Sequence, residues 1–309
     1  MSGEDRSKLE EQIRACYASW ANSYFQDYYD NPHSYPPTHA EVVKEILLAN
    51  QTKVILDAGC GPGSFLRYIA DTEMEWHGFD LVPEMTAEAA RVAQQLGRGN
   101  SEVWIGSVLR DESFSSPRSV KFDGAVMIGV LPHIPIEEDQ RVLKRLRDAV
   151  VPGGTLIAEA RNALFGLFTL NRPTFHLLTE TFMNFQTVRK TSEEETLRIL
   201  DEIEKDLSSR LAMNLPPKRT SSGNGPGYDD VLARMHVPFE LQKSAQQAGW
   251  DEVEIHYAHF HALPPMYEGR FPDVFRKLSL DREDSRDWRG IVMASTVLVS
   301  GKRPFETGI

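Results

Sequence analysis

A short apolar run in the sequence ends in three glycines at alternate positions. The run is Val54–Ala58, and the glycines are Gly59, Gly61 and Gly63. Glycines at such a place let the backbone turn sharply and approach a ligand closely, because no side chain stands in the way. A helix expected over residues 64–70 would direct its N-terminal amides toward that ligand. The pattern indicates a site for a nucleotide-like ligand.

Two aspartates accompany the glycines. Asp57 lies in the apolar run itself, and Asp80 follows a second apolar run at residues 76–79. A carboxylate at the end of a second strand can accept hydrogen bonds from both hydroxyls of an adenosine ribose. A nicotinamide dinucleotide site would prefer glycine at position 64, where this chain has Ser64. A dinucleotide-dependent oxidoreductase is therefore disfavoured.

The elements around these residues alternate in type. Helix-like segments at 64–70, 83–96 and 137–150 separate five short apolar runs, at 54–58, 76–79, 103–105, 122–128 and 155–160. This alternation is typical of a parallel sheet flanked by helices, whose ligands gather at the carboxyl ends of the strands. Pro152-Gly-Gly154 is expected to be a tight turn before the fifth strand.

The second half of the chain departs from this rhythm. Residues 161–235 contain no convincing strand, and Ser192 is expected to cap a long amphipathic helix, with Glu195 as its reciprocal partner. Residues 216–228 have the composition of a flexible loop. A helix at 239–248 and strands at 253–259 and 291–300 follow. We therefore expect an N-terminal helical cap (1–50), an α/β core (51–160), a helical lid insertion (161–235) and C-terminal strands that complete the sheet (236–309).

Four stretches in this order resemble class I S-adenosylmethionine-dependent methyltransferases. They are Asp57-Ala-Gly-Cys-Gly-Pro-Gly63, Gly78-Phe-Asp80, Phe122-Asp-Gly-Ala-Val-Met-Ile-Gly-Val-Leu-Pro-His133 and Val151-Pro-Gly-Gly154. With the lead-in helix, the resemblance covers about the first half of the chain. It implies an α/β, Rossmann-like fold: a mostly parallel seven-stranded sheet with an antiparallel final hairpin and a helical lid insertion.

The resemblance also implies roles for residues that would bind the cofactor S-adenosylmethionine. Asp57, Gly59, Gly61 and Gly63 would hold its methionine end, and Asp80 its ribose. Ser107 and Val108 would flank the adenine, although family members often have an acidic residue where this chain has Ser107. Ile128, at the end of the fourth strand, would also contact the cofactor. Relatives often close a lead-in helix over the cofactor with a tyrosine, for which the candidates are Tyr17, Tyr24 and Tyr35.

Methyl transfer is an in-line displacement at a sulfonium carbon, and a protonated acceptor also needs a base. His133, just after the fourth strand, is the best-placed histidine, although it could equally be a packed or capping residue. His259 and His261 are further candidates. Residues two apart on a strand share a face, so His256 should face away from both, which argues against one metal site for the three.

Four residues after the fifth strand are candidates for binding the methyl acceptor. They are Arg161, Asn162, Phe165 and Phe168. Arg161 could hold a substrate carboxylate through its planar fork, or form an ion pair with Glu159. The aromatic residues suggest a largely apolar acceptor, such as a natural product or other secondary metabolite, or else a small core beneath the lid. The N-terminal aromatics Tyr17, Trp20, Tyr24 and Tyr28 are spaced as one helical stripe.

The amino-acid composition of the chain limits the classes of partner that we expect it to bind. The chain of 309 residues carries a formal net charge of −11, which disfavours binding to nucleic acid. We find no membrane-spanning run and no targeting segment, and two cysteines build no disulfide framework, so a cytoplasmic protein that acts on a small molecule is expected. A catalytically silent cofactor-binding partner or regulator is the alternative function. Composition leaves the oligomeric state open.

Overall fold

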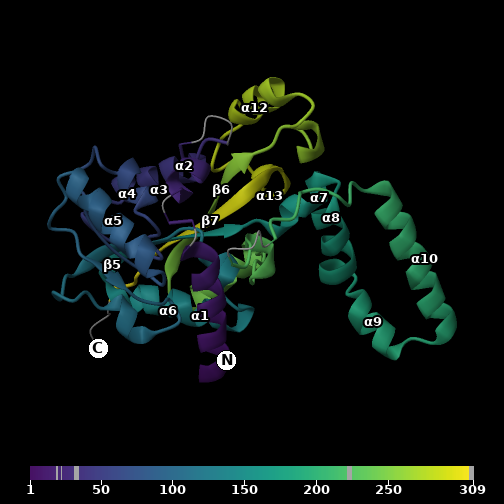
Figure 1. The fold of residues 1–309 in the computed structure, drawn as a ribbon, viewed down its shortest axis with the longest axis horizontal. Coiled ribbons are helices and arrows are strands. Elements are labelled where there is room, and N and C mark those ends of the chain that lie inside the picture. The colour runs from purple at the N-terminus through teal and green to yellow at the C-terminus, as the bar shows by residue number, and fades with distance from the viewer. Residues whose placement is uncertain (19, 22, 31–34, 221–224, 306–309) are drawn as a thin grey trace.

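The structure is a computed structural model that describes residues 1–18, 20–21, 23–30, 35–220 and 225–305. Its centre is a seven-stranded sheet of order β3-β2-β1-β4-β5-β7-β6 (Figure 1). The strands are β1 (Val54–Ala58), β2 (Glu75–Asp80), β3 (Val103–Ile105), β4 (Phe122–Met127), β5 (Val150–Arg161), β6 (Asp251–Phe260) and β7 (Ala294–Lys302). The first five run parallel, and β7 lies antiparallel between β5 and β6. The predicted fold class is confirmed.

Helices cover both faces of the sheet (Figure 1). The helices of the described residues are α1 (Gly3–Ala18), α2 (Tyr24–Tyr28), α3 (Thr38–Ala49), α4 (Ser64–Tyr68), α5 (Pro83–Gln95), α6 (Asp139–Ala149), α7 (Gly166–Thr169), α8 (Arg172–His176), α9 (Phe185–Thr191), α10 (Glu194–Arg210), α11 (Pro238–Gln247), α12 (Pro272–Leu280) and α13 (Gly290–Met293). Pro83 begins α5, and Gly97 follows its end with a φ of 70°, as the sequence predicts.

Two apolar layers hold the helices against the sheet. One layer joins α3, α4 and α5 to the strands through side chains such as Leu47, Leu66 and Val92, all fully buried. The other joins α6 and α11 to the opposite face through Leu143, Leu241 and neighbouring residues. Because burial of apolar area is the main driving force of folding, these layers fix the carboxyl ends of β1, β2 and β4 in one place.

Three expected local features differ in the structure. Ser192 does not cap α10. Its hydroxyl instead donates to the Val188 carbonyl in the last turn of the preceding helix, where carbonyl groups have no N–H partner within the helix. Residues 152–154 are part of β5, where Gly153, with a φ of 81°, allows an irregular register against β4. Gly290–Met293 forms helix α13, so the last strand starts at Ala294, later than predicted.

The predicted N-terminal stripe is not one helix. α1 ends at Ala18 and α2 begins at Tyr24, so the chain turns between them. The turn still brings three of the aromatic rings together: Tyr17 lies 5.6 Å from Trp20 and 6.2 Å from Tyr24, measured between ring centroids. Tertiary packing, which a periodicity argument does not include, replaces the straight helix by two short ones.

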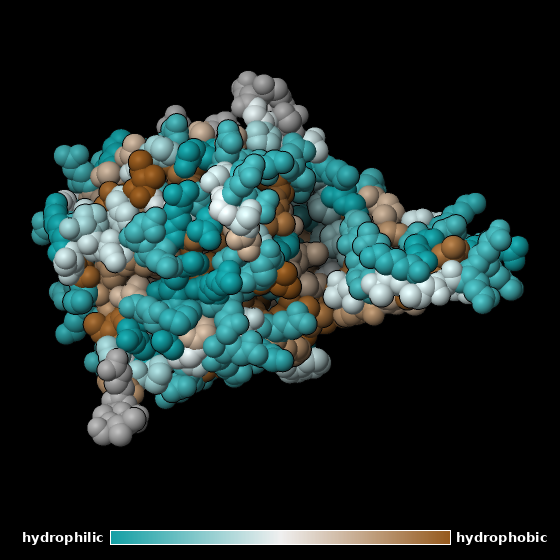
Figure 2. All heavy atoms as spheres, turned by 90° about the horizontal axis from the view of Figure 1, so that it is seen from below, coloured by the Kyte–Doolittle hydropathy of each residue, from teal (hydrophilic) through white to brown (hydrophobic). Residues whose placement is uncertain are grey.

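The insertion forms an arm that leaves the body of the molecule. Helices α8, α9 and α10 project to one side of the sheet (Figure 1). Figure 2 shows the same arm extending from a mostly hydrophilic surface. Leu167 and Leu170, at the base of the arm, are partly exposed. No helix among the described residues is long and apolar enough to cross a membrane.

Candidate functional site

The glycine loop after β1 shapes the floor of a cavity. Gly59, Gly61 and Gly63 all have positive φ angles, a conformation that favours glycine. A Cβ on Gly59 would lie 2.3 Å from a methyl carbon of Val130, so this position excludes larger residues. A Cβ on Gly61 would meet no atom within 4 Å, which shows that its face of the loop is open. Gly63 begins α4.

Asp80 fastens the loop to the end of β2. One carboxylate oxygen accepts a hydrogen bond from the Gly61 N–H at 2.9 Å, and the other accepts from the Val82 N–H at 2.9 Å. Burial raises the pKa of Asp80 despite these bonds. The carboxylate therefore lines the cavity in a fixed orientation, with further lone pairs available for a ligand.

Asp57 is the second carboxylate of the cavity. Its side chain is 2% exposed and accepts a hydrogen bond from the indole N–H of Trp76 at 3.1 Å. Burial, reinforced by the nearby charge of Asp80, raises the pKa of Asp57 to about 7 against the effect of that hydrogen bond. The group is thus poised to lose a proton when a cation binds beside it.

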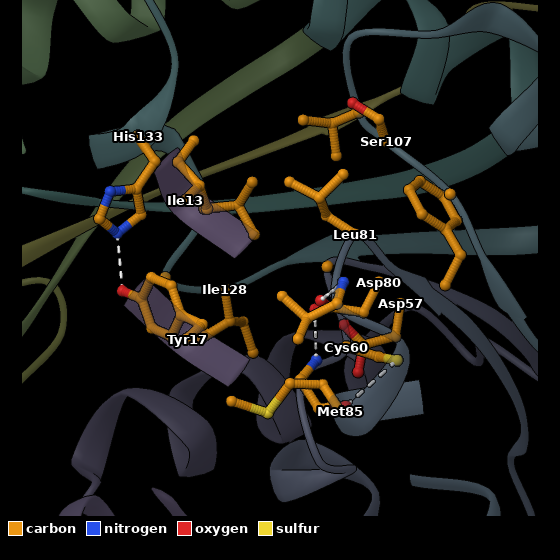
Figure 3. A pocket seen from close by; sticks show the side chains of 18 of the residues that line it. Ile13, Tyr17, Asp57, Cys60, Asp80, Leu81, Met85, Ser107, Ile128 and His133 are labelled. Atoms are coloured by element: carbon orange, nitrogen blue, oxygen red, sulfur yellow. Dashed lines mark hydrogen bonds between the residues drawn. The ribbon is translucent and has the colours of Figure 1, made fainter. Parts of the chain in front are cut away.

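The remaining walls of the cavity are mainly apolar (Figure 3). The cavity and its open mouth together enclose about 950 Å³ of empty space. Ser107, Val108 and Ile128 lie in its wall, where the sequence predicts cofactor contacts. The Ser107 hydroxyl accepts a hydrogen bond from the Leu109 N–H at 3.2 Å.

Helix α1 closes one side of the cavity. Glu10, Ile13 and Tyr17 all line it, and Glu10 forms an ion pair with Arg110. Tyr24, from α2, lines the cavity too. Tyr35 lies elsewhere: its hydroxyl donates to the Glu283 carboxylate at 2.6 Å, lies 3.0 Å from the Phe260 carbonyl, and is not part of the cavity wall. Two of the three candidate tyrosines are thus at the cavity.

His133 and Tyr17 lie next to each other at one side of the cavity, joined by a hydrogen bond (Figure 3). Its Nδ1 lies 2.6 Å from the Leu232 carbonyl, which can only accept, so Nδ1 carries the proton. Its Nε2, 2.7 Å from the Tyr17 oxygen, then accepts a hydrogen bond from the Tyr17 hydroxyl. Burial, together with the charges of Arg161 and Arg219, lowers the pKa of His133 to about 4. The imidazole is therefore neutral at neutral pH.

The other candidate histidines lie outside the cavity wall. His259 is 2.9 Å from His39, measured between ring nitrogens, and burial keeps the pKa of both rings low. His261 packs against Tyr35, Phe165 and Phe275. His256 bonds to Ser300. The ring of Tyr35 contacts both His259 and His261, whereas His256 lies apart from them. The described residues contain no cluster of three or more side chains suited to a metal ion.

The residues after β5 separate into two kinds. Asn162 is buried, donates to three backbone carbonyls around α13 and accepts from the Leu164 N–H, so its amide is used within the fold. Phe165 packs on His261, and Phe168 lies next to Phe165. Arg161 instead extends over the ring of Tyr228, with its central carbon 4.4 Å from the ring centroid. None of these four residues is in the cavity wall.

Several site residues carry no sequence signal of their own. Glu10 and Ile13 are ordinary positions of a polar helix, and Tyr228 and Leu232 lie far along the chain from His133. Only the fold brings them to the cavity or to His133. Only the end of the predicted flexible loop is packed: Tyr228 is buried, and its ring lies 5.2 Å from that of His133, whereas residues 216–220 are exposed. Residues 221–224 lie outside the described part.

Comparison with protein families matches residues 56–156 to a family described as "Methyltransferase domain". Comparison with curated proteins finds no match. Among solved structures, a Haloferax volcanii methyltransferase in complex with the Trm112 methyltransferase activator is 15% identical, with a TM-score of 0.53, over 96% of this chain and 100% of that one. This likeness concerns the fold.

Two further structures are similar at lower TM-scores. A Haemonchus contortus phosphoethanolamine N-methyltransferase 2 with bound S-adenosyl-L-methionine is 14% identical, with a TM-score of 0.48, over 93% of this chain and 57% of that one. An O-methyltransferase family protein from Burkholderia thailandensis is 13% identical, with a TM-score of 0.46, over 87% of this chain and 56% of that one. The match shows a methyltransferase domain at residues 56–156, and this domain lies within a seven-stranded fold similar to that of the solved methyltransferase structure with the TM-score of 0.53.

Proposed function

We propose that the chain binds S-adenosylmethionine in the cavity between α1 and the glycine loop and transfers its methyl group to a small-molecule acceptor. One observation carries the proposal: Asp57 and Asp80, at the carboxyl ends of adjacent strands, line the same cavity as the open face of Gly61. Two carboxylates and a bare backbone suit a ligand that combines an ammonium group with a ribose.

The cavity residues divide between the parts of that ligand. Asp57 and the loop glycines would hold the methionine end, whose ammonium group a carboxylate can bind. Asp80 would accept hydrogen bonds from the ribose hydroxyls. Ser107, Val108 and Met85, beyond Asp80, would enclose the adenine, and Ile128 and Tyr24 would complete the wall. When bound, the cofactor supplies an electrophilic methyl group on a sulfonium.

Tyr17 and His133 would remove the proton of an acceptor hydroxyl or ammonium. Nδ1 of His133 keeps its hydrogen on the Leu232 carbonyl, so Nε2 is the nitrogen that can receive a proton. The Tyr17 hydroxyl already donates to Nε2. The acceptor's proton would pass to the Tyr17 oxygen while the Tyr17 proton passes to His133. Asn162, Phe165, Phe168, His259 and His261 would then support the walls without touching the acceptor.

The insertion suggests where the acceptor binds, and the net charge of the chain suggests its chemical class. The α8–α10 arm projects from the body, whereas the segment from Tyr228 to His236 packs against His133 and the end of β5. We assign acceptor binding to this second segment within the proposed 161–235 insertion. The net charge of −11 favours a small metabolite over a nucleic acid, and a natural product of secondary metabolism fits the aromatic surroundings.

Ligand binding tests the proposal directly. Titration calorimetry is expected to show that S-adenosylmethionine and S-adenosylhomocysteine bind and that NAD does not. Incubation with a labelled methyl donor and metabolites of the source organism is then expected to give a labelled small product. NAD binding without S-adenosylmethionine binding would overturn the assignment. Cofactor binding without transfer to any metabolite would support the silent regulatory partner instead.

Asp57 gives the cofactor affinity a pH dependence. With a pKa of about 7, the free carboxyl is about half protonated at neutral pH, and a bound ammonium favours its ionised form. Cofactor binding at pH 7 is therefore expected to release about half a proton from Asp57, and affinity should fall as the pH drops below 7. Calorimetry in buffers with different ionisation enthalpies measures the proton. Asp57→Asn, compared at the same pH, should lose this release; equal release in both proteins would contradict the assignment.

A further inference from the structure

We propose that the methyl acceptor carries an oxyanion, a carboxylate or a phosphate, that the guanidinium group of Arg161 binds. The inference rests on the proposed function, because it concerns the acceptor of the same site. It begins from the position of Arg161, the last residue of β5, which is the strand beside β4 in the sheet. An acceptor that reaches the cavity must pass over the carboxyl ends of these strands.

The side chain of Arg161 forms no ion pair and no hydrogen bond with any residue that the structure describes. Glu159, the partner that the sequence suggested as an alternative, accepts a hydrogen bond from the Gly129 N–H instead. The charge of Arg161 counteracts the rise in the pKa of Glu159 that burial causes, so this carboxylate is an acidic neighbour without being a bonded partner. The N–H donors of Arg161 are therefore not used within the described part of the fold.

The guanidinium is nevertheless held in place. It lies over the ring of the buried Tyr228, at 4.4 Å from the ring centroid, and Arg219 lies over the same ring at 4.2 Å. Stacking fixes the plane of a guanidinium while leaving its N–H edge free for an acceptor. The half-buried side chain also keeps its unbonded nitrogens in contact with solvent. A planar, fixed and accessible donor edge matches a carboxylate or phosphate.

The position also connects Arg161 to the proton-accepting pair. The charge of Arg161 acts on both Tyr17 and His133, and the ring of Tyr228 lies 5.2 Å from that of His133. Arg161 and Arg219 are among the causes that hold the His133 pKa low. An anion bound at Arg161 would offset part of this positive field and make His133 a stronger base. A neutral acceptor would leave the pKa of His133 unchanged.

The experiment measures binding of simple probes by titration calorimetry, with and without saturating S-adenosylhomocysteine. Benzoate and phenyl phosphate are the anionic probes, and benzamide is the neutral one. At least one anion is expected to bind about 10-fold or more tightly than benzamide, and the preferred anion identifies the group. Arg161→Gln should weaken its binding by about 10–100-fold, because a charge-assisted hydrogen bond is lost. Equal binding of benzamide, or no anion binding, would overturn the inference.

Three further variants separate binding from folding. Tyr228→Phe keeps the stacked ring and should bind the anion like the original protein, whereas Tyr228→Leu should lose part of the affinity. Arg210→Gln removes the same charge on the exposed arm and should change nothing. Anion affinity that survives Arg161→Gln in a folded protein would overturn the inference. Because the probes are also tested without cofactor, a failure of S-adenosylmethionine binding would be seen separately.

Discussion

Replacement of His133 by alanine is expected to lower turnover by about 10²–10⁴-fold, the range for loss of a general base. In the proposed mechanism, Nε2 of His133 receives the proton from Tyr17, and the Leu232 carbonyl fixes the tautomer. Cofactor affinity should change little, because the two carboxylates proposed to bind the cofactor remain in place. Steady-state kinetics and calorimetry on the same preparation measure both quantities.

The pH profile separates this role from a structural one. A base is active when neutral, so activity is present above the pKa of His133 and is lost as the pH falls through it. Because burial lowers this pKa to about 4, turnover should stay constant down to about pH 5 and fall below about pH 4. A histidine of ordinary pKa would instead place this fall in activity at about pH 6.5. Tyr17→Phe should be impaired as well; full activity in either variant would mean that proximity alone drives the transfer.

Replacement of Asp80 by alanine is expected to weaken S-adenosylmethionine binding by roughly 1.5–3 kcal/mol, or about 10–150-fold. The ribose hydroxyls would lose a charged acceptor. The N–H groups of Gly61 and Val82 would lose theirs too, so the loop would be less well ordered before the ligand arrives. Titration calorimetry on the folded variant measures the effect.

Two variants control for loss of charge and loss of order. Asp71→Ala removes a carboxylate that is 70% exposed and paired with Lys44, and should leave the affinity unchanged. Asp80→Asn keeps one oxygen that can accept a hydrogen bond from the loop, so its cofactor affinity should lie between those of the original protein and Asp80→Ala. Unchanged cofactor affinity in a folded Asp80→Ala protein would remove the site from this end of the sheet.

The sequence was most informative where local chemistry decides structure. Strands β1 and β2, the glycine loop and α5 follow from apolar runs, glycines and Pro83, and the structure contains them within one or two residues. These elements also carry Asp57 and Asp80, which lie together at the cavity as expected.

Other parts of the site depend on contacts between distant segments. The bonds of His133 to Tyr17 and Leu232 span 116 and 99 residues, and no periodicity or motif encodes them. The same holds for Arg161, whose ring partner Tyr228 comes from a segment that composition alone marks as a flexible loop. The sequence also does not show which ionisable groups are buried. Burial raises the pKa of Asp57 and lowers that of His133, whereas the sequence alone gives only their ordinary pKa values.

The bond between Tyr17 and His133 has a consequence for the timing of each reaction cycle. The same helix that lines the cavity also supplies the hydroxyl bonded to Nε2 of His133, so this bond exists only while α1 lies at the cavity. On the proposed function, a movement of α1 that widens the mouth for product exchange also separates the catalytic pair. Ligand exchange and proton transfer then alternate and cannot overlap. Release of S-adenosylhomocysteine, rather than the methyl transfer itself, would then set the pace of turnover.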